Sequence, residues 1–422
     1  KPQARLPGVA KREVFGWAMY DFANSGFTTV VITAVFSAYF VGAVAQGAPW
    51  GAFAWTATLG VSYALVMLTM PALGAWADLR AAKKRLLAVV TALCVLTTAA
   101  LALVGPGDLW LAIVLLILAN TTYSWGESTS YAFLPEIATP EAIGKVSGWG
   151  WGLGYAGGML TLGLCLAYVL SAQARGETAG DFVPVTMLIT AGMYGAASLF
   201  TFALLKERAE PQVAVAQASG VRASLARLRS TWQASRQYRD FSWLLTSAFF
   251  YQGGVAVAIT LAAIYAQQVI GFQADEVMIL VFVINAAAMA GALAFGYVQD
   301  RIGHRLTLAL TLVGWAVTCV WAGLATDKAT FWGAAWLAGI CMGSSQSSGR
   351  AMAGLLAPAH QLAEFYGLWS FATRLAAIAG PVMYGAITWA TQGDQRTAIF
   401  ATTALFVAGL LCLIPLDMAR GR

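Results

Sequence analysis

Charged side chains are scarce in this sequence. Lysine, arginine, aspartate and glutamate make up 10% of its 422 residues, whereas 59% of the residues are hydrophobic. Soluble globular proteins carry about 25% charged residues. So low a content excludes an ordinary soluble domain. It also argues against a nucleic-acid partner, because the net charge of +6 is spread along the chain and forms no single basic surface.

Residues that hold metals and cofactors are scarce as well. The two histidines, His304 and His360, are far apart in the sequence, and none of the five cysteines belongs to a CxxC pair. A GxGxxG match at 152–157 lies in an apolar segment with no strand before it, so small-residue helix packing explains it better than dinucleotide binding. No Walker loop is present, and no nucleophile or metal ligands are clustered. We therefore expect no cofactor, no metal, no enzyme and no ATP-driven pump. We also expect no cleaved signal peptide.

Long apolar segments dominate the chain instead. A helix needs about 20 apolar residues to cross the hydrocarbon layer, and an open sheet cannot cross it. At that length the sequence predicts twelve membrane-spanning helices, at 15–42, 51–76, 84–104, 109–132, 145–171, 183–205, 241–269, 275–299, 305–325, 330–353, 363–390 and 396–417. The predicted fold class is an all-α membrane protein with two pseudo-symmetric six-helix bundles.

The basic residues between these segments predict the orientation. Lysine and arginine are retained on the cytoplasmic side of membrane proteins. With an even number of helices, one side receives most basic residues, whereas the other receives only Arg175, Lys328 and Arg396. We therefore expect both termini in the cytoplasm, in an integral multi-pass protein of a prokaryotic inner membrane.

The longest connector divides the chain into an N-terminal unit, 1–205, a linker, 206–240, and a C-terminal unit, 241–422. From Pro211 to Arg239 the linker has no acidic residue and carries five arginines. Its apolar residues recur at helical spacing and are Val221, Leu225, Leu228 and Trp232. This pattern predicts an amphipathic helix on the cytoplasmic membrane surface, with a solvated basic linker as the alternative.

One motif occurs twice, at the same place in each half. Gly74 precedes Asp78 and Arg80 after the second predicted helix, and Gly296 precedes Asp300 after the eighth. The second copy continues through Arg301 to Arg305 and fits G-x-x-x-D-R-x-G-x-R, which resembles the signature loop of the major facilitator superfamily. The first copy departs from it, with Leu79 and Ala81 in place of a basic residue and a glycine. The resemblance implies that these residues hold a cytoplasmic gate closed, whereas a simple topology anchor would not need the repeated spacing.

Other segments resemble a narrower branch of that superfamily, the vacuole-effluxer-like proteins. They are WAMYDFANS at 17–25, FLPEI at 133–137, GKVSG at 144–148, QSSGR at 346–350 and EFYG at 364–367. These segments fall in both halves, so the resemblance covers nearly the whole chain. The fungal members are implicated in amino-acid export from the vacuole, which makes an amino acid the substrate that the resemblance implies.

Four ionisable residues lie inside apolar segments, where a charge is costly and marks function or pairing. They are Asp21, Glu127, Arg350 and Arg374. Glu127 and Arg350 occupy equivalent places in the two halves, so we predict a salt bridge between them that closes the inner gate. Asp21 or Glu127 could instead carry a coupling proton, and Arg374 could bind a substrate carboxylate. A permanent ion pair that fixes helix packing is the structural alternative.

Aromatic and amide residues at similar depths form the predicted specificity set of a cavity for an amphipathic solute. They are Tyr20, Asn24, Tyr123, Tyr251, Gln252 and Gln346, with Trp125 and Asn285 as further candidates. Each could also serve helix packing alone.

These features together predict a secondary transporter that moves an amino acid or similar zwitterion by alternating access, coupled to protons. A lipid or drug exporter and a transport-inactive receptor of the same fold remain the alternatives. The expected partners are a small-molecule substrate, a proton and membrane lipid, for a monomeric protein.

Overall fold

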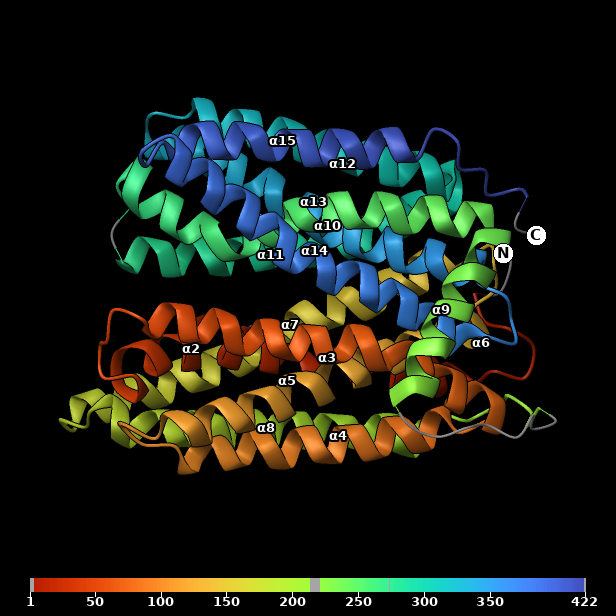
Figure 1. Cartoon of the computed structure of the whole chain (residues 1–422), viewed down its shortest axis with the longest axis horizontal. Coiled ribbons are helices and arrows are strands. Elements are labelled where there is room, and N and C mark those ends of the chain that lie inside the picture. Colours follow the sequence, from red (N-terminus) through yellow and green to blue (C-terminus); the bar gives the residue numbers. More distant parts are fainter. Residues whose placement is uncertain (1–3, 213–220, 273, 421–422) are drawn as a thin grey trace.

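The computed structural model describes residues 4–212, 221–272 and 274–420, and over these ranges the chain is almost entirely helical. Long helices lie side by side in two bundles, one from each half of the sequence (Figure 1). Both marked chain ends lie at one side of the molecule, which we call the terminal side.

The N-terminal bundle contains six long helical segments. The first runs through α1 (Lys11–Gly26), η1 (Phe27–Ala34), α2 (Phe36–Tyr39) and η2 (Phe40–Val44). The others are α3 (Gly51–Arg80), α4 (Lys83–Ala100) with its extension η3 (Leu101–Leu103), α5 (Leu109–Tyr131), α7 (Ile143–Ala174) and α8 (Ala179–Leu204). A short helix, α6 (Leu134–Ile137), joins α5 to α7.

The C-terminal bundle repeats this plan. Its members are α10 (Arg239–Tyr265) continued by η4 (Ala266–Ile270), α11 (Ala274–Ile302), α12 (His304–Leu324), α13 (Lys328–Leu356), α14 (Leu362–Ala390) and α15 (Gln395–Cys412). Each predicted segment coincides with one of these helices, so the predicted twelve-helix fold is confirmed. Ten spans in the described ranges are long and apolar enough to cross a membrane. The other two predicted spans, α13 and α14, are 29 residues long and carry the polar residues of the site.

The first helix changes its winding where β-branched residues crowd together. Thr28, Thr29, Val30, Val31, Ile32 and Thr33 follow one another, and the backbone over Phe27–Ala34 adopts the wider π-helical turn. Branching at Cβ disfavours the α-helix, and π-helical turns are frequent at functional sites. The change lies directly beyond Asp21 and Asn24, in the middle of the bundle.

The two bundles are packed tightly on the terminal side. Helix α14 packs against α3 of the other bundle, and α11 packs against α7. Every residue of α14 from Leu362 to Ser370 is buried, but between 373 and 390 only Ala376, Gly380 and Tyr384 are buried. These three form a single i, i+4 stripe. The N-terminal third of α14 is therefore enclosed on all sides, whereas the remainder is covered along one face.

The basic linker forms helix α9 (Val221–Gln237), on the terminal side (Figure 1). Thr231 is buried and donates a hydrogen bond to the Glu364 carboxylate, and the Trp232 ring lies 6.1 Å from that of Phe371. Just before the helix, the Gln212 amide donates to Leu79 O at 2.9 Å and its side chain donates to His360 O at 2.8 Å. The linker thus contacts both bundles. The side chains of Val221, Leu225 and Leu228 lie outside the described residues.

Candidate functional site

An ion pair between the two bundles involves Asp21 and Arg350. The Arg350 Nη1 atom lies 2.7 Å from the Asp21 carboxylate, and Arg350 is 1% exposed. The guanidinium also donates to Ser147 Oγ at 3.1 Å and to Ser147 O at 2.7 Å. Arg350, on α13, therefore holds both α1 and α7 of the opposite bundle. A buried cation is tolerated there because three acceptors surround it.

Aromatic rings enclose the same guanidinium. Its central carbon lies 4.9 Å from the ring centres of Trp17 and Tyr131 and 5.3 Å from that of Trp151. Stacking on aromatic faces suits arginine because its planar cation is weakly hydrated. The space for it comes from Gly150, where an added Cβ would lie 2.6 Å from both Arg350 Nη2 and the Asp21 carboxylate. Part of the glycine-rich run at 148–158 thus serves the ion pair, and no dinucleotide-binding loop is formed.

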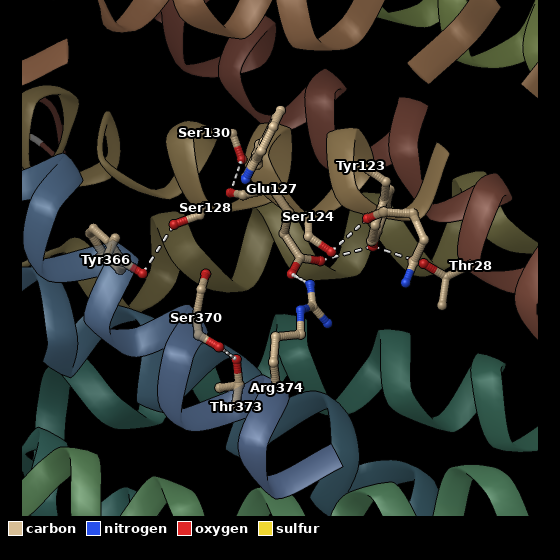
Figure 2. A network of polar contacts seen from close by, with 12 residues as sticks. Thr28, Tyr123, Ser124, Glu127, Ser128, Ser130, Tyr366, Ser370, Thr373 and Arg374 are labelled. Atoms are coloured by element: carbon tan, nitrogen blue, oxygen red, sulfur yellow. Dashed lines mark hydrogen bonds and ion pairs between the residues drawn. The ribbon is translucent and has the colours of Figure 1, made fainter. Parts of the chain in front are cut away.

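A second ion pair between the bundles involves Glu127 and Arg374. Arg374 Nη2 lies 2.9 Å from Glu127 Oε1, and the Tyr123 hydroxyl donates to Glu127 Oε2 at 2.8 Å. Thr28 donates in turn to Tyr123 at 2.8 Å, and the Arg374 guanidinium lies 5.7 Å from the Tyr63 ring centre. Figure 2 shows Arg374 reaching from α14 to Glu127 on α5. The side chains of Glu127 and Arg374 are 19% and 16% exposed, so this pair is far less enclosed than the first.

The predicted salt bridge between Glu127 and Arg350 is therefore wrong in its partners. Both residues pair across the bundles, but Glu127 meets Arg374 and Arg350 meets Asp21. The reason is the pseudo-symmetry itself. Helix α5 packs against α14, and its counterpart α13 packs against α7, so equivalent residues on α5 and α13 face different partners.

The repeated aspartates both bind the start of a helix in the opposite bundle. Asp78 accepts hydrogen bonds from Ala363 N at 3.1 Å and Glu364 N at 2.9 Å, in the first turn of α14. Asp300 accepts from Gly144 N and Lys145 N, both at 2.9 Å, in the first turn of α7. The first amides of a helix have no intrahelical acceptor, and the helix dipole favours a negative charge there.

The repeated glycines allow this approach. A Cβ at Gly74 would lie 2.4 Å from Ala363 O, and one at Gly296 would lie 2.8 Å from Gly144 O. The motif therefore acts as a pair, in which the glycine brings the backbones together and the aspartate, one turn later, caps the helix that has been brought close.

The basic residues of the motif are placed differently. Arg80, Arg301 and Arg305 are exposed, and Arg80 lies over the Trp76 ring at 5.6 Å. The buried cation of the first loop is Lys83, which pairs with Glu136 on α6 and lies 3.8 Å from Glu207 at the start of the linker. The structure brings the glycines and aspartates of the motif to the contact between the bundles, but leaves these three arginines at the surface.

Two predicted cavity residues are fully buried. Tyr20 is 0% exposed and its hydroxyl bonds to Thr91 at 2.9 Å and Tyr194 at 3.0 Å, inside the N-terminal bundle. Tyr251 is also 0% exposed, within the C-terminal bundle. Tyr20 therefore points into the core of its own bundle and away from the opposite one, whereas a place for Tyr251 in the cavity stays a prediction.

The predicted amide residues differ from one another in their hydrogen-bond partners. Gln252 and Gln346 bond reciprocally at 2.8 and 3.2 Å, and this pair is partly buried. Asn24, one turn after Asp21, is 3% exposed, and its Nδ2 atom has no hydrogen-bond partner in the described part of the chain. Asn285 bonds to its own helix at Val281 O, and Trp125 donates to Thr69 at 2.9 Å.

Several residues of this region were not singled out from the sequence. Ser147 lies within the GKVSG segment and Tyr63 in the middle of an apolar helix, where neither stands out. Ser128 donates to Tyr366 O at 3.0 Å and adds another bond between α5 and α14. The sequence signal for Ser128 is the run of three small hydroxyl residues at 128–130.

The polar contacts between the two bundles lie on the terminal side of the molecule. In the described ranges, the polar contacts that join the two bundles end at Glu127 and Arg374, 12 residues into α14. At 1.5 Å per residue this is about 18 Å from the start of that helix. The structure is therefore closed on the terminal side down to mid-depth. No group of three potential metal ligands occurs in the part of the chain that the structure describes.

Comparison with known proteins gives a consistent assignment. Residues 51–422 match the family described as "Vacuole effluxer Atg22 like". An uncharacterized MFS-type transporter, YxiO of Bacillus subtilis, is 30% identical over 417 residues, covering 94% of this chain and 93% of its own length. Autophagy-related protein 22-1 of Aspergillus niger is 23% identical over 328 residues, which are 72% of this chain and 52% of that protein.

Solved structures show the same fold. The human organic anion transporter MFSD10 superposes with a TM-score of 0.74 at 14% identity, covering 96% of this chain and 99% of that one. The proton:xylose symporter XylE superposes with a TM-score of 0.73 at 12% identity, covering 95% and 94%. This family and fold are those of transporters, not of enzymes. The chain belongs to the vacuole effluxer Atg22-like family of the major facilitator superfamily and is an integral, multi-pass membrane transporter.

Proposed function

We propose that this transporter moves a small zwitterionic solute, most simply an amino acid, by alternating access coupled to protons. The observation that carries the proposal is the Glu127–Arg374 pair. It offers an anion and a cation 2.9 Å apart, at the inner limit of the closed terminal side, and both side chains are still partly exposed. A free amino acid presents the complementary arrangement of one ammonium and one carboxylate group.

Exchange of partners is energetically feasible at such a pair. A substrate ammonium can replace Arg374 at Glu127 while its carboxylate takes Arg374, so neither buried charge loses its counter-ion. Breaking the pair without replacement would cost about 3–5 kcal/mol. The Arg374 Nε atom, which has no partner in the described part of the chain, supplies a further donor for a carboxylate. Tyr123 donates to the same carboxylate and is itself held by Thr28, and these two side chains would limit the size of the substrate side chain.

The gate is the second part of the proposal. Asp78 and Asp300 each tie the start of a helix in the opposite bundle, and the Asp21–Arg350 pair lies between these two contacts and the Glu127–Arg374 pair. Under the positive-inside rule the terminal side is cytoplasmic, so the conformation described faces outward. On this view 1–205 and 241–422 are the two moving units, and 206–240 connects them on the cytoplasmic side.

We place proton coupling at Asp21. Its carboxylate is one of three acceptors that hold Arg350 against the opposite bundle. Protonation would remove the charge from that contact and weaken the closed state, whereas deprotonation would restore it. A proton would then accompany each opening of the cytoplasmic side.

The test is uptake into proteoliposomes over a panel of amino acids and related solutes, with and without an imposed proton gradient. Glu127→Gln and Arg374→Gln should each reduce binding of the transported solute about a hundredfold or more, because one substrate charge loses its counter-ion. Glu276→Gln is the matched control, since Glu276 pairs with Lys328 at 2.7 Å within the C-terminal bundle. Uptake of apolar dyes or lipids in place of zwitterions would overturn the proposal in favour of an exporter. Binding without uptake of any solute would indicate a receptor.

A further inference from the structure

A groove opens on the side of the molecule between α1, α7 and α11. Its volume is about 650 Å³, and its walls are almost wholly apolar, with Trp149, Leu153 and Ala156 from α7 and Met289 and Leu293 from α11. Phe15, 47% exposed, stands at the opening. Because α7 and α11 belong to different bundles, the groove exists only where the two bundles are in contact.

Small residues create the depth of this groove. A Cβ at Gly152 would lie 2.7 Å from the Leu293 side chain, so the glycine allows α11 to approach α7 closely. Ala18 and Ala156 leave space on the other wall. The result is a narrow apolar channel that runs along the helices and suits a hydrocarbon chain, which has no polar atoms to satisfy.

One end of the groove is basic. Arg5 and Lys11 line its terminal end, and Lys145 lies over the rings of Trp149 and Tyr297, at 6.0 and 5.9 Å. In the described ranges none of these three cations forms a salt bridge with an acidic side chain. Arg5 donates one bond to Val9 O at 2.6 Å, which fixes its position while leaving other guanidinium donors for a ligand.

We infer that this groove binds one anionic phospholipid from the leaflet on the terminal side. Its phosphate is held by Arg5, Lys11 and Lys145, and one acyl chain lies along α7. Tryptophan and tyrosine are enriched at the level of the headgroups, and Trp149 and Tyr297, which both contact Lys145, fit this assignment. Three cations that form no salt bridge in the described ranges, next to an apolar channel, match the two parts of such a lipid, whereas a soluble anion would leave the channel empty.

The lipid would also affect the gate. It contacts both α7 and α11, so it binds the closed form and is released when these helices separate on the terminal side. A ligand that binds one of two conformations stabilises that conformation. This consequence rests on the proposed alternating access, but the binding site itself does not, since it is defined by the groove and its charges.

The inference is tested with the full chain in nanodiscs that contain phosphatidylglycerol or phosphatidylcholine, each with a photoreactive acyl chain. Adducts from phosphatidylglycerol are expected within 149–156 and 289–293. The double variant Arg5→Gln/Lys11→Gln should reduce them about thirtyfold, since each cation near the headgroups contributes about a factor of five. Ala156→Trp, which fills the channel and leaves the charges in place, should abolish them.

The matched control is Arg229→Gln/Arg236→Gln, which removes two exposed cations from α9, a helix that in the described part of the chain packs against α3 and α14 and not against the groove helices, and should leave the adducts unchanged. Equal labelling by both lipids, unaffected by loss of Arg5 and Lys11, would overturn the anionic site. If the protein elutes as a folded monomer and carries no adducts within 149–156 or 289–293, the groove is overturned as a lipid site. Neither readout involves substrate or transport, so these outcomes are independent of the proposed function.

Discussion

The sharpest prediction concerns Asp78 and its contact with the start of α14. In Asp78→Asn one side-chain oxygen can still accept a backbone hydrogen bond, but the negative charge is lost and an amide group faces the second N–H. Hydrogen bonds to a charged group contribute about 1.5–3 kcal/mol each, and an unsatisfied buried donor costs about 1–3 kcal/mol. We therefore expect the closed state to lose about 2–3 kcal/mol, a shift of about 30- to 150-fold toward opening on the terminal side.

The assay is labelling of a cysteine introduced at position 128. Ser128 is 0% exposed and donates to Tyr366 O of the opposite bundle, so Ser128→Cys is accessible only when α5 and α14 separate. In membrane vesicles with the terminal side outward, a membrane-impermeant maleimide should label this position faster in Asp78→Asn. The same vesicles without Ser128→Cys report labelling of the five natural cysteines.

Asp240→Asn provides the control. Asp240 is 7% exposed, as Asp78 is, and also accepts a backbone N–H, from Asp417 at 2.9 Å, but both partners belong to the C-terminal bundle. It should leave labelling at position 128 unchanged. Equal labelling rates in Asp78→Asn, Asp240→Asn and the parent would refute the reasoning that the motif aspartate holds the bundles together.

Three other changes test neighbouring parts of the structure. Asp21→Asn should abolish gradient-driven uptake but retain solute binding and exchange. Wild-type gradient dependence in this variant would remove Asp21 from coupling and leave Glu127, in the second ion pair, as the acidic candidate. Gly150→Ala should lower the melting temperature, because its Cβ would lie 2.6 Å from both Arg350 Nη2 and the Asp21 carboxylate. Gly163→Ala on the same helix meets nothing within 4 Å and should be neutral or stabilising. Similar melting temperatures of the two variants would contradict this reasoning. Thr231→Val removes the bond to Glu364 at almost constant side-chain volume. It should speed amide hydrogen exchange in α9 by lowering the free energy of local opening by about 1–2 kcal/mol. Unchanged exchange would show that this bond does not fix the linker.

The sequence was sufficient for the fold because each element of it leaves a local signal. Twelve apolar segments of spanning length define the helices, and the repeated Gly-to-Asp spacing marks equivalent positions in the two halves. The outcome for Gly74, Asp78, Gly296 and Asp300 follows the same logic. A glycine and an aspartate four residues apart lie on the same face of a helix, and the structure places both of them against one helix start.

Pairing and orientation could not be predicted in the same way. A charge in an apolar segment shows that a partner is needed, but the partner depends on which helices face each other across the two bundles. Glu127 and Arg350 were therefore recognised as important but assigned to each other. Tyr20 illustrates the problem of orientation, because a helix that is apolar on most faces does not show which side faces the core. Its neighbour Asp21 points to the opposite bundle, and Tyr20, about 100° around the helix, points to Tyr194.

The two ion pairs between the bundles differ in a way that separates their roles. Arg350 is 1% exposed and is enclosed by Asp21, Ser147 and three aromatic rings, so a solute could reach it only after the bundles had separated. Arg374 and Glu127 have the same charges at a similar distance, but both retain exposed surface, and Arg374 Nε has no partner in the described ranges. In the proposed mechanism the Asp21–Arg350 pair, whose side chains are 10% and 1% exposed, responds to a proton or to movement of the helices. A pair with spare donors at the boundary of the closed region can exchange its partners for those of a solute. On this proposal the Asp21–Arg350 pair locks the transporter, and the Glu127–Arg374 pair binds the solute. Their adjacency gives a direct route by which occupancy of one could alter the other.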